Sequence, residues 1–332
     1  MSGPPNHEVL MQSRPQALPT LQHQKPSAIG LTWAAIGAVS VVFVLYVLVG
    51  WVSGGVAQVV PGSDPMAPGK AIVMHVLEWG QFAVFVAILW HFVLRRLVRR
   101  EALGFDGLFV LAAILLNFWD VLDNYSVFSF QYNAHQLNLG SWAGFIPGWR
   151  SPEPELWAVP IAFVFGAYTW AFFVAVRSGC QILSRVHLRH PDWAPWRGFA
   201  IVFASNAALC AVSENVYLRI GAFANIHPYE ALTVWDGQPY AWPVYNPILF
   251  GLTWTAMTAL RWYRDQDGLS FVERAIPEVV RSGRLQTLLR FFAIFAFLEL
   301  TYILLYFLPW NAFALMRTVP PNIVPSYFPV PQ

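Results

Sequence analysis

The feature that most limits how this chain can fold is a series of seven long apolar runs. Each run is close to the ~20 residues that a helix needs to cross a bilayer. Only 11% of the residues are charged and 57% are hydrophobic, whereas about 25% are charged in an ordinary soluble protein. We therefore expect an all-α integral membrane protein, a bundle of seven transmembrane helices. The expected spans are Ile29–Trp51, Ala71–Leu94, Phe105–Phe128, Leu156–Val176, Phe199–Ile220, Tyr240–Leu260 and Leu288–Leu308.

The distribution of arginine predicts how these spans are oriented. Residues 1–28 are rich in proline and lack the apolar core of a signal peptide, which indicates a disordered cytoplasmic tail. The loops after the second, fourth and sixth spans hold most of the arginines, so the N-terminus is expected inside the cell and the Pro-rich tail 309–332 outside. This topology accounts for the basic residues. The lipid bilayer is thus the predicted partner, and no nucleic acid is predicted.

The third apolar run ends in a polar cluster, NFWDVLDN at residues 117–124. On an α-helix Asn117, Asp120 and Asn124 follow an i, i+3, i+7 spacing with Asp123 beside them, so one face carries four polar groups. Acids at membrane depth are costly and are therefore candidates for function. The sequence that continues to Glu155 is longer than an ordinary connection and has few charges, which favours a folded extracytoplasmic lid.

Two parts of the chain look alike. The fourth span contains FGAYTW at 165–170, and the sixth contains FGLTW at 250–254. The third and fifth spans carry similar residues at the same offsets, with Gly107, Asp123 and Asn124 matching Gly198, Glu214 and Asn215. These matches suggest a parallel internal repeat of a helix–lid–helix unit.

Depth along the spans gathers the acids into the outer half of the membrane. With a rise of 1.5 Å per residue through a core of ~30 Å, five carboxyls from four helices fall there, and no Lys or Arg is expected at that depth. A buried carboxyl without a cationic partner favours its neutral form, and a neutral acid beside an ionised one is a general acid–base pair. The candidate catalytic residues are Asp123, Glu214, Glu78 and Asp120.

Polar and aromatic side chains near these acids are candidates for binding an apolar small-molecule substrate. Tyrosines could hold the substrate, asparagines could orient the carboxyls, and Trp faces could stabilise a developing cation. The alternative is that these groups only join helices to one another or form an interfacial aromatic belt. The candidate residues are His75, Asn117, Asn124, Tyr125, Tyr132, Asn133, Trp142, Trp149, Asn215, Tyr217, Glu299 and Tyr302.

A metal site is the main rival interpretation of the acids. His75, Glu78, Asp120 and Asp123 are plausible ligands. A di-iron oxidase would need more histidines at membrane depth, and a prenyl-diphosphate site would need a second Asp-rich motif and cations for the phosphates. We therefore predict no metal and no cofactor.

The segments DNYSVFSFQYN (123–133) and GSWAGFIPGWRSPEPE (140–155) resemble the signature of the AveC-like spirocyclases, polytopic membrane proteins named for the enzyme that forms the spiroketal of avermectin-type macrolides. The resemblance implies cofactor-free acid catalysis on a hydroxy-ketone or hemiketal, with cyclisation and dehydration as neighbouring outcomes. Two alternatives stay open: a metal-dependent membrane enzyme of isoprenoid or lipid metabolism, and a proton-coupled transporter or lipid-binding protein.

Overall fold

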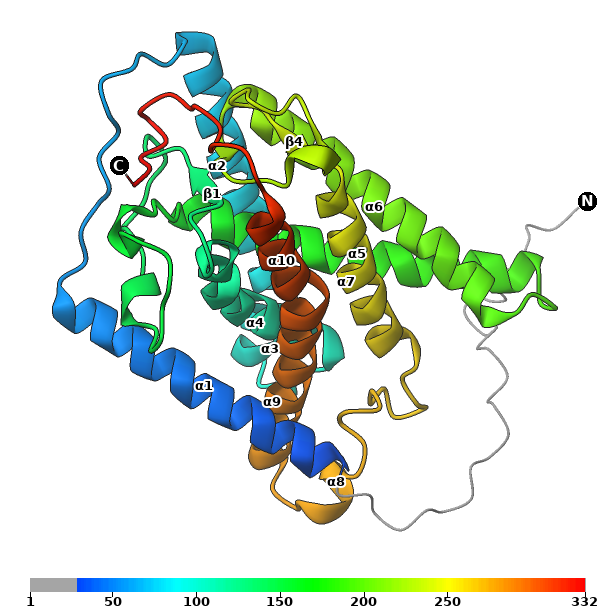
Figure 1. Ribbon diagram of the computed structural model, residues 1–332. Coiled ribbons are helices and arrows are strands. Elements are labelled where there is room, and N and C mark those ends of the chain that lie inside the picture. Colours follow the sequence, from blue (N-terminus) through cyan, green and yellow to red (C-terminus); the bar gives the residue numbers. More distant parts are fainter. Residues whose placement is uncertain (1–28, 332) are drawn as a thin grey trace, which may run out of the picture.

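The computed structural model describes residues 29–331 and shows a helical chain with a few short strands (Figure 1). Six helices of the described part are long and apolar enough to cross a membrane. They are α1 (Ile29–Gly54); α2 (Pro68–Leu89), continued by a π-helical turn (Trp90–Leu94) and α3 (Arg95–Val98); α4 (Phe105–Leu116), continued by a 3-10 helix (Asn117–Asn124); α5 (Ile161–Arg189); α6 (Pro195–Ile220); and α9 (Gly283–Tyr302), continued by a π-helical turn (Ile303–Phe307) and α10 (Leu308–Met316).

These six helices correspond to six of the seven predicted spans, with shifted ends. The fourth predicted span begins later, at Ile161, because the loop before it extends to Pro160. The sixth predicted span is α7 (Tyr245–Trp262), which is helical over 18 residues but is not among the six. The predicted tail 1–28 lies outside the described residues.

The helices enclose α4 at the centre. Most of α4 is buried, whereas most residues of α1, α2 and α6 are exposed or half-buried, as those of apolar helices facing lipid would be. α1 crosses α9 at close range because Gly37 has no side chain: a Cβ there would collide with the carbonyl of Phe292. Because α4 is the central helix, the acids at its end lie in the middle of the bundle.

The end of α4 is a 3-10 helix, which corrects the predicted helical face. With about three residues per turn, residues three apart eclipse one another, so Asp120 and Asp123 lie in one row. Asn124 is turned away from that row. Its Oδ1 accepts hydrogen bonds from the backbone N–H groups of Ser129 and Phe130, both at 2.8 Å, and fixes the start of the following loop.

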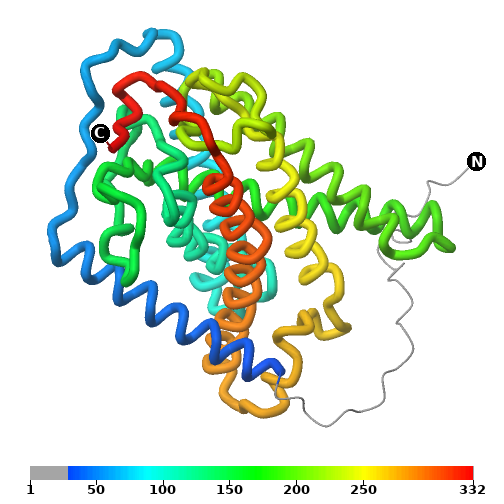
Figure 2. Tube along the Cα trace, in the orientation of Figure 1, coloured from blue at the N-terminus to red at the C-terminus, as the bar shows by residue number. Residues whose placement is uncertain are grey.

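At one end of the molecule the loops 55–67, 125–160 and 221–244 meet the C-terminal segment 317–331 (Figure 2). β1 (Phe130–Tyr132) pairs antiparallel with β2 (Phe223–Asn225), and β3 (Thr233–Val234) pairs with β4 (Trp242–Pro243). Each of the two longer loops therefore supplies one strand of the first sheet. The internal repeat stays a prediction. Short helical turns complete the described elements, at Ala143–Phe145, Pro154–Leu156, Glu230–Leu232 and α8 (Ile276–Val279).

The segment predicted as a C-terminal tail is ordered. Helix continues to Met316, and the residues after it lie across the 125–160 loop (Figure 2). The N–H of Ala134 donates to the carbonyl of Tyr327 at 2.9 Å, and the N–H of Gly62 donates to the carbonyl of Ser326 at 3.0 Å. The C-terminal segment thus joins two loops that are far apart in the sequence.

Candidate functional site

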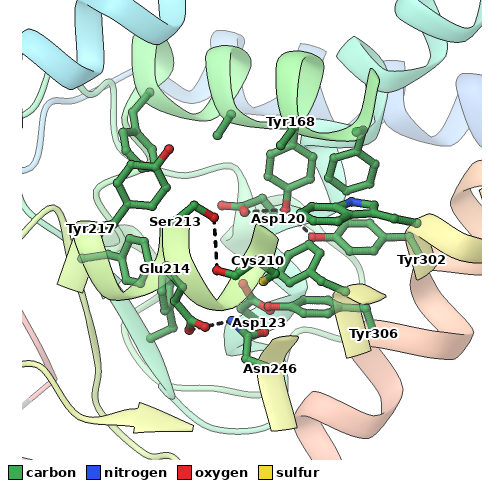
Figure 3. Close-up of a pocket in the computed structure, with 18 of the residues that line it drawn as sticks. Asp120, Asp123, Tyr168, Cys210, Ser213, Glu214, Tyr217, Asn246, Tyr302 and Tyr306 are labelled. Carbon is green, nitrogen blue, oxygen red and sulfur yellow. Dashed lines mark hydrogen bonds between the residues drawn. The ribbon is translucent and has the colours of Figure 1, made fainter. Parts of the chain in front are cut away.

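A cavity of about 110 Å³ lies among the 3-10 end of α4, α5, α6, α7 and the C-terminal helix (Figure 3). Its wall is largely aromatic, and three carboxyl groups line it: Asp120, Asp123 and Glu214. The cavity thus combines an apolar interior with a few acidic groups.

Asp120 is held by tyrosine hydroxyls. The hydroxyl of Tyr168 on α5 donates to Oδ1 at 2.6 Å, and the hydroxyl of Tyr132 on β1 lies 3.1 Å from both carboxyl oxygens. Tyr168 also contacts the hydroxyl of Tyr302 at 2.7 Å, so Tyr302 is the donor in that pair. Burial, and next the nearby Asp120 carboxyl, raise the pKa of Tyr132 well above its usual value, which keeps this hydroxyl protonated as a donor. The carboxyl oxygens of Asp120 are therefore placed to accept hydrogen bonds.

Asp123 lies one 3-10 turn further along, about 6 Å of helix rise from Asp120. Its side chain lines the cavity near Tyr306, and its Oδ1 is buried without a hydrogen-bond partner (Figure 3). Buried polar atoms are nearly always paired in folded proteins, so an unpaired one at a cavity wall leaves an acceptor free for a bound molecule. Asp123 is the acid of the cavity that is most available to a ligand.

Glu214 on α6 has a different environment. Asn246 Nδ2 on α7 donates to Oε1 at 2.6 Å, and Trp242 Nε1 on β4 donates to Oε2 at 2.8 Å. Both partners are N–H donors, so both carboxyl oxygens act as acceptors, as they do in a carboxylate. The arrangement suits Glu214 to hold negative charge at the cavity wall.

The π-helical turn of the C-terminal helix aligns three aromatic residues with the cavity. In an α-helix four residues advance by about 400°, so a series at i, i+4, i+8 drifts around the axis. The wider turn at Ile303–Phe307 offsets this drift, and Tyr302, Tyr306 and Trp310 all line the cavity. Pro309 explains why the turn occurs here, because proline has no N–H to donate to the preceding turn.

Aromatic rings from α5 and α7 complete the wall. Phe172 packs edge-on to Trp254 with ring centroids 5.6 Å apart, and Phe250 lies 5.1 Å from Trp254. The Trp254 Nε1 is buried without a partner, as is the Oδ1 of Asn246. Ring faces of this kind stabilise a cation, and the unpaired groups offer one donor and one acceptor to a bound molecule.

Six of the predicted site residues line the cavity: Asp120, Asp123, Glu214, Tyr132, Tyr217 and Tyr302. Asp123 and Glu214 therefore share the cavity, whereas Glu78 lies apart from it. Glu78 Oε1 accepts from the N–H of Leu137 at 2.9 Å, and Oε2 contacts Nδ1 of His75 at 2.9 Å. This pair fastens the 125–160 loop to α2, away from the cavity.

Glu299, Asn215 and Asn117 also point elsewhere. Glu299 accepts from the hydroxyl of Ser40 at 2.6 Å, in the contact between α1 and α9. Asn215 and Asn117 donate to backbone carbonyls of their own helices. These side chains face other parts of the bundle.

The remaining predicted binding residues belong to the 125–160 loop and its supports. Trp142 Nε1 donates to the carbonyl of Phe118 at 2.9 Å, Tyr125 packs edge-on to Trp149, and Asn133 Nδ2 donates to the carbonyl of Gly221 at 2.8 Å. Together with Asn124 they fix the loop rather than line the cavity.

Sequence reasoning missed four residues that contact the acids or lie beside them: Tyr168, Tyr306, Trp242 and Asn246. Tyr168 lies inside the FGAYTW match, and Tyr306 follows Tyr302 by four residues. Both signals were visible in the sequence. Asn246 gave no comparable signal.

Within residues 29–331 no three His, Cys, Asp or Glu side chains are grouped so that they could hold a metal ion. His75 and Glu78 lie together, but Asp120 and Asp123 face the cavity instead. The four candidate metal ligands therefore do not lie together at one site. Cys180 and Cys210 are both unpaired and buried.

Apolar helices long enough to span a bilayer, together with a buried cavity of carboxyl and tyrosine groups, fit a polytopic membrane protein with an enzyme-like site. The chain matches the AveC-like spirocyclases over residues 98–332, more than two thirds of its length, and it belongs to that family. Comparison with curated proteins and with solved structures gave no match. The resemblance noted at residues 123–155 is thus confirmed, and all three cavity acids lie inside the matched region.

Proposed function

We propose that this protein is a membrane-embedded acid–base cyclase that closes a hydroxy-ketone or hemiketal into a cyclic ketal without a cofactor. One observation carries the proposal: Asp120, Asp123 and Glu214 share a single aromatic cavity but have different hydrogen-bond environments. Groups of one chemical type in different settings can take different roles in acid–base chemistry. Membership of the AveC-like spirocyclases supports the same reaction class.

In this mechanism Asp123 is the general acid. Its carboxyl gives a proton to the hydroxyl of a bound hemiketal, that hydroxyl leaves as water, and an oxocarbenium ion forms. A second hydroxyl of the substrate attacks the cationic carbon, and its proton passes to Asp120. The net change is hemiketal to spiroketal plus one water. Asp120 then returns its proton to Asp123, about 6 Å away along the 3-10 helix, through the released water.

The rest of the cavity stabilises the charge that develops. Glu214, whose two oxygens accept from Asn246 and Trp242, supplies fixed negative charge, and the faces of Trp254 and Phe172 supply cation–π attraction. Tyr132 and Tyr168 lower the cost of negative charge on Asp120. If Asp120 removed a proton from carbon instead, the product would be an alkene, so dehydration is the neighbouring outcome.

The proposal includes the membrane arrangement. α7 completes a set of seven spans, the Arg-rich loops are cytoplasmic, and the 125–160 loop is an extracytoplasmic lid over the cavity. The supporting observation is that this loop, the 221–244 loop and the C-terminal segment meet at one end, whereas Asp106 pairs with Arg261 at 2.8 Å and Arg177 at 3.5 Å at the other.

The test compares apolar extracts of cells with and without the gene by mass spectrometry. We expect a hydroxy-ketone or hemiketal to accumulate in its absence, heavier by one water than the product that disappears. Purified protein in vesicles should convert this compound into a single stereoisomer of a cyclic ketal. Accumulation of a diphosphate would support a metal-dependent lipid enzyme, and an unaltered compound retained on one side of the membrane would support a transporter.

A further inference from the structure

The exposure of the residues around the cavity is uneven. Most of them are buried, and the partly exposed ones fall mainly along one seam between α5 and α6. They are Ala167, Trp170 and Ala171 on α5, Ser213 and Tyr217 on α6, and Phe250 on α7. The cavity therefore approaches the surface at the side of the bundle.

The end of the cavity next to the loops is closed. Phe130 and Tyr132 of β1 and Phe223 of β2 line the cavity and are buried, with the paired loops above them. Tyr132 is also tied to Asp120. A substrate arriving from water at this end would have to break the sheet and that contact.

One limit of the seam is a three-helix contact at Gln81 of α2. Its Oε1 accepts from Trp170 Nε1 and from the Tyr217 hydroxyl, both at 2.9 Å. The helices touch here because Gly166 has no side chain: a Cβ would lie 2.8 Å from the backbone carbon of Gln81. The Nε2 of Gln81 is buried without a partner, so two hydrogen bonds to one oxygen hold this junction.

The other limit is the contact of α5 with α6 and α7 at Gly179. A Cβ there would lie 2.7 Å from Oγ1 of Thr258 and 3.1 Å from Val202. From Trp170 to Gly179 α5 rises about 13 Å. Between these limits Val174 is 42% exposed, and the small side chains of Ala171 and Ser213 border the cavity. We call this stretch the α5–α6 window.

We propose that the substrate enters the cavity from the hydrocarbon of the bilayer through the α5–α6 window. The hydrogen bonds of Gln81 to Trp170 and Tyr217 close the end of the window that lies nearer the loops. This proposal rests on the proposed function and deepens it. The substrate class is a membrane-dissolved amphiphile with a long apolar part, whose ketone and hydroxyl groups reach the acids while the rest extends toward lipid. The small residues at the window leave room for the apolar part of the substrate, and their apolar neighbours match the hydrocarbon of the bilayer outside.

The test measures access to the cavity without relying on turnover. The protein in lipid vesicles is irradiated with a small lipid-soluble aryl diazirine, whose carbene reacts with any nearby side chain, and adducts are located by peptide mass spectrometry. We expect adducts on the cavity residues Asp123 and Tyr302. A charged, water-soluble diazirine should give at least ~10-fold fewer of them.

Variants at the window provide a second test of the entry route. Ala171→Trp and, independently, Ser213→Trp should each reduce cavity adducts by ~10-fold, because a large ring fills the opening. Ala204→Trp, on an exposed part of α6 away from the cavity, is the matched control and should change nothing. Gln81→Leu should raise the rate of cavity labelling several-fold. Labelling of exposed Val212 is the internal standard for folding and for reagent in the bilayer.

Equal cavity labelling by the two reagents, or no effect of either tryptophan in protein of normal thermal stability, would overturn the window. Asp123→Asn separates this result from the proposed function. It should reduce turnover by roughly 10²–10⁴-fold while Tyr302 is still labelled through the window. Full turnover in Asp123→Asn would refute the chemistry and leave the entry route standing.

Discussion

The hydroxyl of Tyr132 lies 3.1 Å from both carboxyl oxygens of Asp120. Tyr132 belongs to a loop strand and Asp120 to the buried end of α4, so this contact joins the cover of the cavity to one of its acids. Since β1 is paired with β2, the position of the acid depends on both loops. This contact thus links the loop segment that resembles the family to an acid of the proposed chemistry.

The first prediction concerns this contact. Tyr132→Phe should reduce turnover by ~10–100-fold, because a hydrogen bond to a charged group contributes about 1.5–3 kcal/mol. Tyr125→Phe is the matched control: its hydroxyl donates to the carbonyl of Gly148 in the same loop, outside the cavity, and should leave turnover nearly unchanged. Initial rates on the accumulated substrate decide the matter, and equal rates in the two variants would argue against a role for the Asp120 contact.

The second prediction separates loop fixation from catalysis. Glu78→Gln keeps an oxygen for the N–H of Leu137 and an amide for His75, but it removes the acid. We expect turnover within a few-fold of the wild type and a small fall in melting temperature. A loss of 10²-fold or more in protein of normal stability would return Glu78 to the catalytic set.

A third prediction tests the ordered C-terminal segment. Arg317 is buried and donates to Asp236 Oδ1 at 2.8 Å, to the carbonyl of Pro320 at 2.7 Å and to Asn322 Oδ1 at 3.0 Å. Arg317→Gln should destabilise the folded state by roughly 2–4 kcal/mol, because several buried acceptors lose a charged donor. Thermal unfolding and the rate of limited proteolysis after Met316 measure this, and Arg284→Gln, far from these loops, is the control. An unchanged cleavage rate would show that the segment is held by other contacts.

The fourth prediction is the proposed topology. His135 is an exposed residue of the 125–160 loop, so His135→Cys should react with an impermeant thiol reagent in intact cells. Asp192→Cys, in the exposed turn between α5 and α6, should react only after the cells are opened. The reverse pattern would invert the orientation of the bundle.

Much of this arrangement could be predicted from the sequence, because hydrophobic length sets the spans and the position of an acid along a span sets its depth. Asp123 and Glu214 do share a cavity. Depth is only one coordinate, however, and it does not say which way a side chain faces. Glu78 and Glu299 were selected by the same depth argument, but they point to a loop and to α1.

Local backbone geometry accounts for most of the remaining differences. The 3-10 end of α4 puts Asp123 in line with Asp120, and the π-helical turn brings Tyr306 to the cavity beside Tyr302. Neither change has a reliable signal in the apolar pattern, which is read with an α-helical period. Trp242 reaches Glu214 only because the 221–244 loop folds back, a long-range contact that periodicity cannot predict.

The central claim is that Asp123 donates the proton, and the most direct measurement is the turnover of Asp123→Asn on the accumulated substrate. The amide keeps the size of the side chain but cannot supply the proton, so turnover should fall by roughly 10²–10⁴-fold while melting temperature and expression stay near those of the wild type. Glu299→Gln, a buried acid that does not line the cavity, is the matched control and should retain activity. Activity of Asp123→Asn within a few-fold of the wild type would contradict the account.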